Sequence, residues 1–137
     1  MGHASSLFNG DGEQTLISRV SPTTQQREFL QNSWHALAEH LRGALRAKHG
    51  YQISTWLQGS YKYGTLIKPV HPGEEYDVDL GVYFEWGSAE NIEPTADQLR
   101  RWVQRELVDY RDQCADILNV AEPPKERCPQ IGRASCR

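Results

Sequence analysis

A glycine-serine dipeptide followed by a strand that carries two aspartates constrains this chain more than any other feature. The run that starts at Gln58 reads Gln-Gly-Ser-Tyr-Lys-Tyr-Gly-Thr-Leu-Ile-Lys-Pro-Val-His-Pro-Gly-Glu-Glu-Tyr-Asp-Val-Asp-Leu. Gly59 and Ser60 predict a small turn, and Asp77 and Asp79 lie two residues apart on a predicted strand. Alternate residues of a strand point to the same face, so we expect both carboxylates on one side of a sheet.

This combination of residues is suited to binding a divalent metal ion and a triphosphate together. Two neighbouring carboxylates repel each other, and a Mg²⁺ or Mn²⁺ ion between them removes that repulsion. The backbone N–H groups at Gly59 and the hydroxyl of Ser60 are donors for phosphate oxygens. The pattern predicts nucleotidyl transfer, with Asp77 and Asp79 as catalytic metal ligands. Its structural alternatives are a solvated edge strand whose acids deter aggregation and an ordinary strand-to-helix connection.

Charge and composition limit the class of ligand and the cell compartment. The 137 residues include fifteen basic and eighteen acidic side chains, which gives a net charge of −3. Proteins that bind duplex nucleic acid are usually basic, so free nucleotides are the better candidate ligands. The sequence has no apolar stretch of transmembrane length and no secretory signal. Cys114, Cys128 and Cys136 lack zinc-site spacing and are expected to be reduced thiols in a cytoplasmic protein.

Hydrophobic periodicity and capping residues predict an N-terminal arm at 1–24 and a core domain at 25–137. The predicted elements are a helix from 21 to 50, a strand at 52–57, a strand at 76–84 and a helix from 95 to about 120. The first helix has apolar residues at steps of three and four, namely Leu30, Trp34, Leu37, Leu41 and Leu45. In the second, Thr95 and Gln98 have capping-box spacing. We therefore expect an α/β fold whose incomplete mixed sheet is flanked by two long helices.

The same residues carry a resemblance to a known family. Gly-Ser followed by an Asp-hydrophobic-Asp strand resembles the DNA polymerase β-like nucleotidyltransferases. The longer run, from Gln58 to Pro69 and from Pro72 to Tyr83, resembles the bacterial cGAS/DncV-like nucleotidyltransferases (CD-NTases) of CBASS anti-phage defence. The resemblance implies a cytoplasmic enzyme that joins nucleoside triphosphates, such as ATP and GTP, into a cyclic di- or trinucleotide and releases pyrophosphate. A regulatory protein of the defence operon is a further candidate partner.

The resemblance also assigns roles to individual residues. It implies that Gln58, Gly59 and Ser60 contact the triphosphate and that Asp77 and Asp79 hold two Mg²⁺ ions. The family requires a third carboxylate on a later strand and a helical C-terminal half, and the sequence offers neither at the expected place. Asp109, Asp112 and Asp116 fall within the predicted second helix and do not match the missing carboxylate.

We therefore expect the chain to be the N-terminal part of such an enzyme and to make little or no cyclic nucleotide alone. Two alternatives remain open from the residues themselves. One is another polymerase β-like nucleotidyltransferase, such as an RNA-tailing or antibiotic-adenylylating enzyme, which product analysis would separate. The other is a non-catalytic interaction module, whose function would survive replacement of both aspartates by asparagine.

Overall fold

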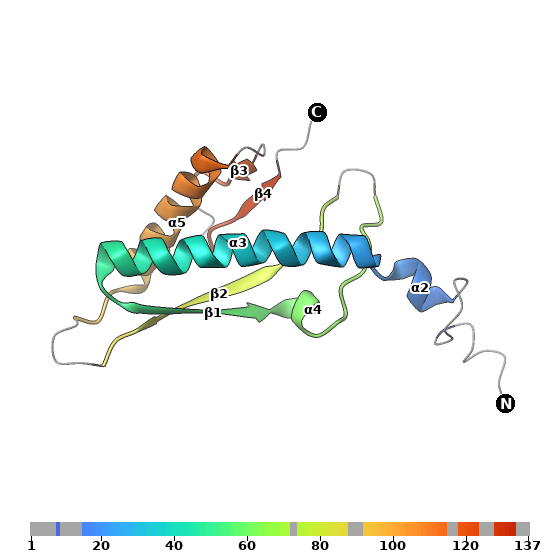
Figure 1. Ribbon diagram of the computed structural model, residues 1–137, viewed down its shortest axis with the longest axis horizontal. Helices are drawn as coiled ribbons and strands as arrows, with labels where there is room; N and C mark the ends of the chain where they lie inside the picture. Colours follow the sequence, from blue (N-terminus) through green and yellow to red (C-terminus); the bar gives the residue numbers. More distant parts are fainter. Residues whose placement is uncertain are drawn as a thin grey trace. The chain divides into compact units, whose positions relative to one another are not determined.

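The structure, a computed structural model, describes residues 8, 15–71, 74–87, 92–114, 118–123 and 128–133. In chain order its helices and strands are α2 (Leu16–Val20), α3 (Thr24–His49), β1 (Gln52–Gln58), α4 (Gly59–Lys62), β2 (Asp79–Glu85), α5 (Ala96–Gln113), β3 (Leu118–Val120) and β4 (Ile131–Arg133) (Figure 1). Helices and short strands share the chain, so the predicted α/β class is confirmed. Within the described ranges, every helix is too short or too polar to cross a membrane.

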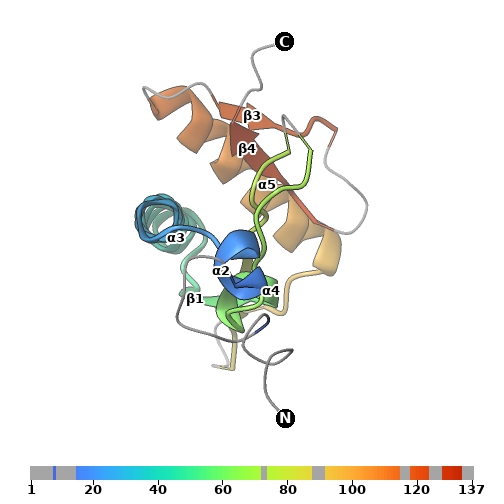
Figure 2. The ribbon, with the colours of Figure 1, turned by 90° about the vertical axis from the view of Figure 1, so that its right-hand side faces the viewer.

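The strands form two small sheets. β1 pairs with β2, and the two strands run in opposite directions (Figure 1). β3 pairs with β4 in an antiparallel register that places Val120 opposite Ile131. The second sheet lies against α5 (Figure 2). Each sheet has two strands in the part of the chain that the structure describes.

The chain divides into two compact units. The first consists of residues 1–34 and 57–80, and the second of residues 35–56 and 81–137. The first unit therefore contains the Gly-Ser turn and both aspartates. Its buried residues include Thr15, Pro22 and Leu66. The second unit holds the larger apolar core, which is made of Ala38, Leu41, Leu45, Tyr51, Ile53, Phe84, Leu107 and Val120.

The helix predicted from 21 to 50 is confirmed as α3. The side-chain carbonyl of Gln26 accepts a hydrogen bond from the Thr23 N–H at 2.8 Å, and the Thr23 hydroxyl accepts one from the Gln26 N–H at 3.2 Å. These reciprocal bonds satisfy two backbone donors that the first helical turn leaves unpaired. The helix ends at His49, before Gly50 with φ +74°, a conformation that glycine adopts without steric cost. Of the predicted apolar stripe, Leu41 and Leu45 are fully buried.

The second long helix begins where it was predicted but ends earlier. Thr95 and Gln98 make the predicted capping box of α5. The helix stops at Gln113 rather than near Val120, because Cys114 adopts an extended conformation and residues 118–120 pair with β4 instead. Helical periodicity cannot anticipate a strand partner that lies further along the chain, and here the pairing prevails. Ile117 and Asp116, also assigned to this helix, lie outside the described residues, as does Cys136.

Two other predicted boundaries also differ from the structure. The arm at 1–24 was expected to be extended, but Leu16–Val20 is helical, because the Thr15 side chain caps the first turn by accepting from the Ser18 N–H. The strand expected from residue 76 begins at Asp79. Its partner β1 gives way to a helix at Gly59, so residues before Asp79 have no neighbouring strand with which to pair. The division into an arm and a core domain stays a prediction.

Candidate active site

The Gly-Ser turn is the start of a very short helix that follows β1 directly. Gln58 is the last residue of β1 and the N-cap of α4, with φ −128° and ψ −177°. Gly59 then takes φ +64°, in the left-handed region that favours glycine. The Tyr63 N–H donates to the Gly59 carbonyl at 3.2 Å and closes the turn. An extended residue, a left-handed glycine and a helical turn thus reverse the chain at the end of the strand.

Gly59 lies directly against the carboxylate of Asp79. A Cβ atom placed on Gly59 would come within 2.9 Å of the Asp79 Cγ and 3.3 Å of the Asp79 Cβ, and it would overlap Oδ2. Real Cβ atoms essentially never approach heavy atoms within 3.0 Å, so a side chain at residue 59 would require the Asp79 carboxylate or the turn to move. The structure therefore brings the turn and the second aspartate together, as the sequence reasoning anticipated.

The two aspartates lie at the start of β2 and just before it. Asp79 is the first residue of the strand, and Asp77 precedes the strand by two residues. Both are exposed, whereas Val78 and Leu80 are half-buried. Exposure therefore alternates as predicted, and both carboxylates are accessible to water and to dissolved ions. The expectation that both lie on the strand is wrong, because Asp77 precedes it. Their roles as metal ligands and catalytic residues stay predictions.

No group of three or more potential metal-binding side chains occurs among the residues that the structure describes. Two of the three helix aspartates considered from the sequence are engaged elsewhere. Asp109 pairs with Lys48 at 2.9 Å, and Asp112 accepts from Arg111 at 3.0 Å. Asp109 and Asp112 both belong to the second unit, whereas the turn and the aspartate pair belong to the first. Neither residue is therefore proposed as a third metal ligand.

The segment between the turn and the aspartates has its own fixed points. The Thr65 N–H donates to the Ser60 carbonyl at 2.9 Å, which joins the segment to the turn. Further along, the Glu74 carboxylate accepts from the N–H groups of Val70 and His71, both at 3.0 Å. His71 itself is exposed.

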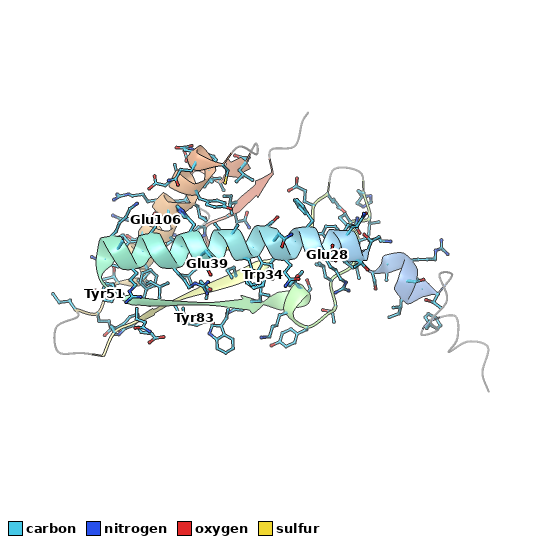
Figure 3. All side chains as sticks on the ribbon, in the orientation of Figure 1. Glu28, Trp34, Glu39, Tyr51, Tyr83 and Glu106 are labelled. Atoms are coloured by element: carbon cyan, nitrogen blue, oxygen red, sulfur yellow. The ribbon has the colours of Figure 1, made fainter. Side chains whose placement is uncertain are left out.

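The sequence analysis missed a buried carboxylate in the second unit. Glu106 projects from α5 toward α3, and its side chain is 1% exposed (Figure 3). Its Oε1 accepts from Lys48 at 2.6 Å, and this bond is the main reason that the pKa of Lys48 is raised. Its Oε2 lies 3.8 Å from His40 Nε2, and neither of these buried atoms has a hydrogen-bond partner. Glu106 follows Trp102 by four residues and therefore shares its face of the helix. An acidic residue on the same face as this tryptophan was a usable signal of burial.

Comparison with known proteins identifies the family. The sequence profile of the nucleotidyltransferase domain of cyclic GMP-AMP synthases of the DncV-like type matches residues 53–135. The chain belongs to this DncV-like nucleotidyltransferase family. The match covers β1, the turn and both aspartates, so the family resemblance noted from the sequence is confirmed.

The curated and solved DncV-like relatives are considerably longer than this chain. A cyclic GMP-AMP synthase of Escherichia albertii is 36% identical over 114 residues, which cover 79% of this chain and 25% of the relative. One from Vibrio cholerae serotype O1 is 54% identical over 28 residues, or 20% of this chain and 6% of the relative. The crystal structure of Vibrio cholerae DncV cyclic AMP-GMP synthase in complex with nonhydrolyzable GTP superimposes with a TM-score of 0.70 at 17% identity. It matches 88% of this chain and 45% of the solved one, and at this identity it confirms the fold.

Proposed function

We propose that this chain provides the metal- and triphosphate-binding part of an enzyme that joins nucleoside triphosphates into a cyclic di- or trinucleotide. The reaction releases pyrophosphate, and the product serves as a second messenger in anti-phage defence in the cytoplasm. The observation that carries the proposal is the contact between Gly59 and Asp79, which places a phosphate-sized turn beside an accessible carboxylate. The similarity to cyclic GMP-AMP synthases supports the choice of reaction.

The residues of the site fit a magnesium or manganese ion. Asp77 and Asp79 offer carboxylate oxygens, the ligands that hard divalent cations prefer, and both are exposed. The left-handed glycine has no side chain, so the Asp79 carboxylate lies directly against the turn. When bound, the metal ion neutralises phosphate charge and lowers the energy of the charge that develops during transfer.

The turn is proposed to hold the triphosphate. Ser60 follows the left-handed glycine that lies against Asp79, the carboxylate that would share the ion. Gln58 is exposed at the end of β1 and begins the turn. These three residues would bind and orient the triphosphate, and the two aspartates would hold the metal ion beside it. Orientation is a large part of catalysis in phosphoryl and nucleotidyl transfer.

The test is binding of ATP and GTP by the chain in the presence of Mn²⁺, measured by isothermal titration calorimetry. Asp77→Asn and Asp79→Asn keep the size of each side chain but remove the charge, and each is expected to weaken binding at least about tenfold. Asp112→Asn is the matched control, because it removes the same charge from an exposed aspartate on α5. The proposal is supported if Asp112→Asn binds the triphosphates as tightly as the wild type does and both Asp77→Asn and Asp79→Asn bind them more weakly.

Product formation is followed in the same samples with all four radiolabelled triphosphates. Little or no cyclic product is expected from the chain alone; a phosphatase-resistant cyclic product that disappears in the Asp77→Asn variant would show that the chain suffices for the reaction. Equal binding by the wild type and both site variants would overturn the assignment of the aspartates and favour a non-catalytic interaction module. Linear transfer to RNA or to a drug would point to a different reaction of the same superfamily.

A further inference from the structure

The N-terminal segment is tied by its backbone to the segment that leads to the aspartates. The carbonyl of Val20, the last residue of α2, accepts a hydrogen bond from the Lys68 N–H at 2.6 Å. The two residues are far apart in sequence and belong to the same compact unit, the one that contains the turn and the aspartate pair. This contact joins an element outside the matched family region, residues 53–135, to one inside it.

The segment that donates this bond is otherwise held by hydrogen bonds between residues close together in the chain, Thr65 to Ser60 and Val70 and His71 to Glu74. Between α4 and β2, the described residues 63–71 and 74–78 form neither helix nor strand. Leu66 is only 7% exposed, whereas its neighbours Ile67 and Val70 are 57% and 75% exposed. The described residues of this segment, 63–71 and 74–78, are called the linker, which is anchored near Leu66 and Lys68. Asp77 lies near its end, two residues before β2.

The N-terminal partner is itself well organised. Thr15 is 6% exposed, its hydroxyl accepts from the Ser18 N–H at 3.2 Å, and its carbonyl accepts from the Ser18 hydroxyl at 2.8 Å. The Ser21 N–H bonds to the Ile17 carbonyl at 2.9 Å, and Pro22 is buried. A helix of five residues is not stable alone in water, and α2 itself has no buried residue. Its ends are held by the buried residues Thr15 and Pro22 and by the bond from Lys68 to Val20.

We propose that Thr15–Pro22 acts as a brace that positions the linker and, through it, Asp77 for metal binding. The brace touches no reacting group and is a positioning element. This inference rests on the proposed function, because it assumes that Asp77 is a metal ligand. Its structural half, the ordering of the linker, can be measured independently of any metal.

The first test compares Lys68→Pro with Lys68→Ala. Both remove the amine, but only proline removes the backbone N–H that donates to Val20. Residue 68 already precedes Pro69 and is therefore biased to the extended conformations that proline can also adopt. In Lys68→Pro we expect faster amide hydrogen exchange across the linker and an affinity for Mn²⁺ alone that is about fivefold weaker, the equivalent of one net hydrogen bond. Lys68→Ala should behave as the parent chain does.

A second pair of variants acts from the other side of the contact and covers the case in which Lys68→Pro does not fold. Thr15→Val keeps the shape but removes the hydroxyl that caps α2, and Thr15→Ser restores it. Thr95→Val is the matched control, because Thr95 accepts from the Gln98 N–H at the same 3.2 Å in the second unit. We expect Thr15→Val to loosen the linker and weaken Mn²⁺ binding, with recovery in Thr15→Ser and no effect of Thr95→Val.

The outcomes separate the brace from the proposed function. Unchanged linker exchange in both Lys68→Pro and Thr15→Val would overturn the brace. Faster linker exchange with unchanged Mn²⁺ affinity would overturn its positioning role. If the parent chain and its Asp77→Asn variant bind Mn²⁺ equally, the metal site in the proposed function fails, while the exchange data still decide whether α2 orders the linker. Mn²⁺ affinity is read from the loss of the free-ion electron paramagnetic resonance signal.

Discussion

Replacing Gly59 by alanine tests the geometry of the site most directly. The added Cβ would lie 2.9 Å from the Asp79 Cγ, so the carboxylate has to rotate or the turn has to move. Gly64 supplies a matched control. It also has a positive φ, +70°, but a Cβ there would meet nothing within 4 Å. The two substitutions therefore share the backbone penalty and differ in the clash with Asp79.

The expected costs follow from these two conformations. Alanine in the left-handed region costs about 1–2 kcal/mol of stability, and this applies to both Gly59→Ala and Gly64→Ala. Gly59→Ala additionally forces the Asp79 side chain away from its position, at about 0.5–1.5 kcal/mol if it leaves its rotamer. Both variants should thus unfold more easily, and Gly59→Ala somewhat more so. The larger difference is expected in metal binding, because only Gly59→Ala displaces a proposed ligand.

The assay is a Mn²⁺ titration of each variant at a temperature where both are folded, with the free energy of unfolding measured in urea. Gly59→Ala should bind Mn²⁺ about tenfold to a hundredfold more weakly than Gly64→Ala, the range found when a metal ligand loses its orienting contact. Equal Mn²⁺ affinities for the two variants would refute the reasoning. In that case the contact between Gly59 and Asp79 would be a matter of packing, and the turn would not define the metal site.

Three further predictions concern the buried carboxylate, pH and the metal ion. Lys48→Met should lower the midpoint of thermal unfolding more than Glu106→Leu does, because Lys48→Met leaves the buried Glu106 carboxylate without its charged partner. A larger drop for Glu106→Leu would contradict this prediction. Burial beside Trp102 lowers the pKa of His49 below 6.5, although Glu106 opposes the shift. The unfolded chain therefore binds the proton more readily than the folded one. Stability should fall as the pH drops through about 6.5. Thermal melts from pH 8 to 5 should show this fall, and His49→Gln should reduce it. EDTA should abolish calorimetric ATP binding as completely as Asp77→Asn does, and residual binding in EDTA would show that the triphosphate is held without a metal ion.

Signals carried by neighbouring residues predicted the start of α5 correctly, whereas the start of α3 was predicted at residue 21 instead of Thr24. Thr95 and Gln98 specify the start of α5 through bonds that involve only themselves, and Thr23 and Gln26 do the same for α3. Capping chemistry of this kind is complete within four residues, so a sequence contains all of it. The same holds for Thr15 and α2, where the cap was present in the sequence but its meaning was missed.

Boundaries set by distant partners could not be predicted in this way. The end of α5 depends on the pairing of residues 118–120 with β4, and the start of β2 depends on where β1 gives way to α4. Glu106 is a similar case. Its position on the apolar stripe was visible, but its burial depends on Lys48, which lies on α3. In each case the deciding contact joins residues that are far apart in the chain.

The Asp-x-Asp pattern itself shows what the structure adds to the sequence. Strand alternation places acids on one face whether they bind a metal or merely solvate an edge, so periodicity cannot separate these readings. A solvated edge strand makes no demand on the preceding turn. Here two features favour glycine beside Asp79, namely its φ of +64° and the contact in which an added Cβ would displace the Asp79 carboxylate. A turn fitted this closely to one carboxylate is expected where phosphate and metal share a site, and this favours the metal-binding interpretation over the edge strand.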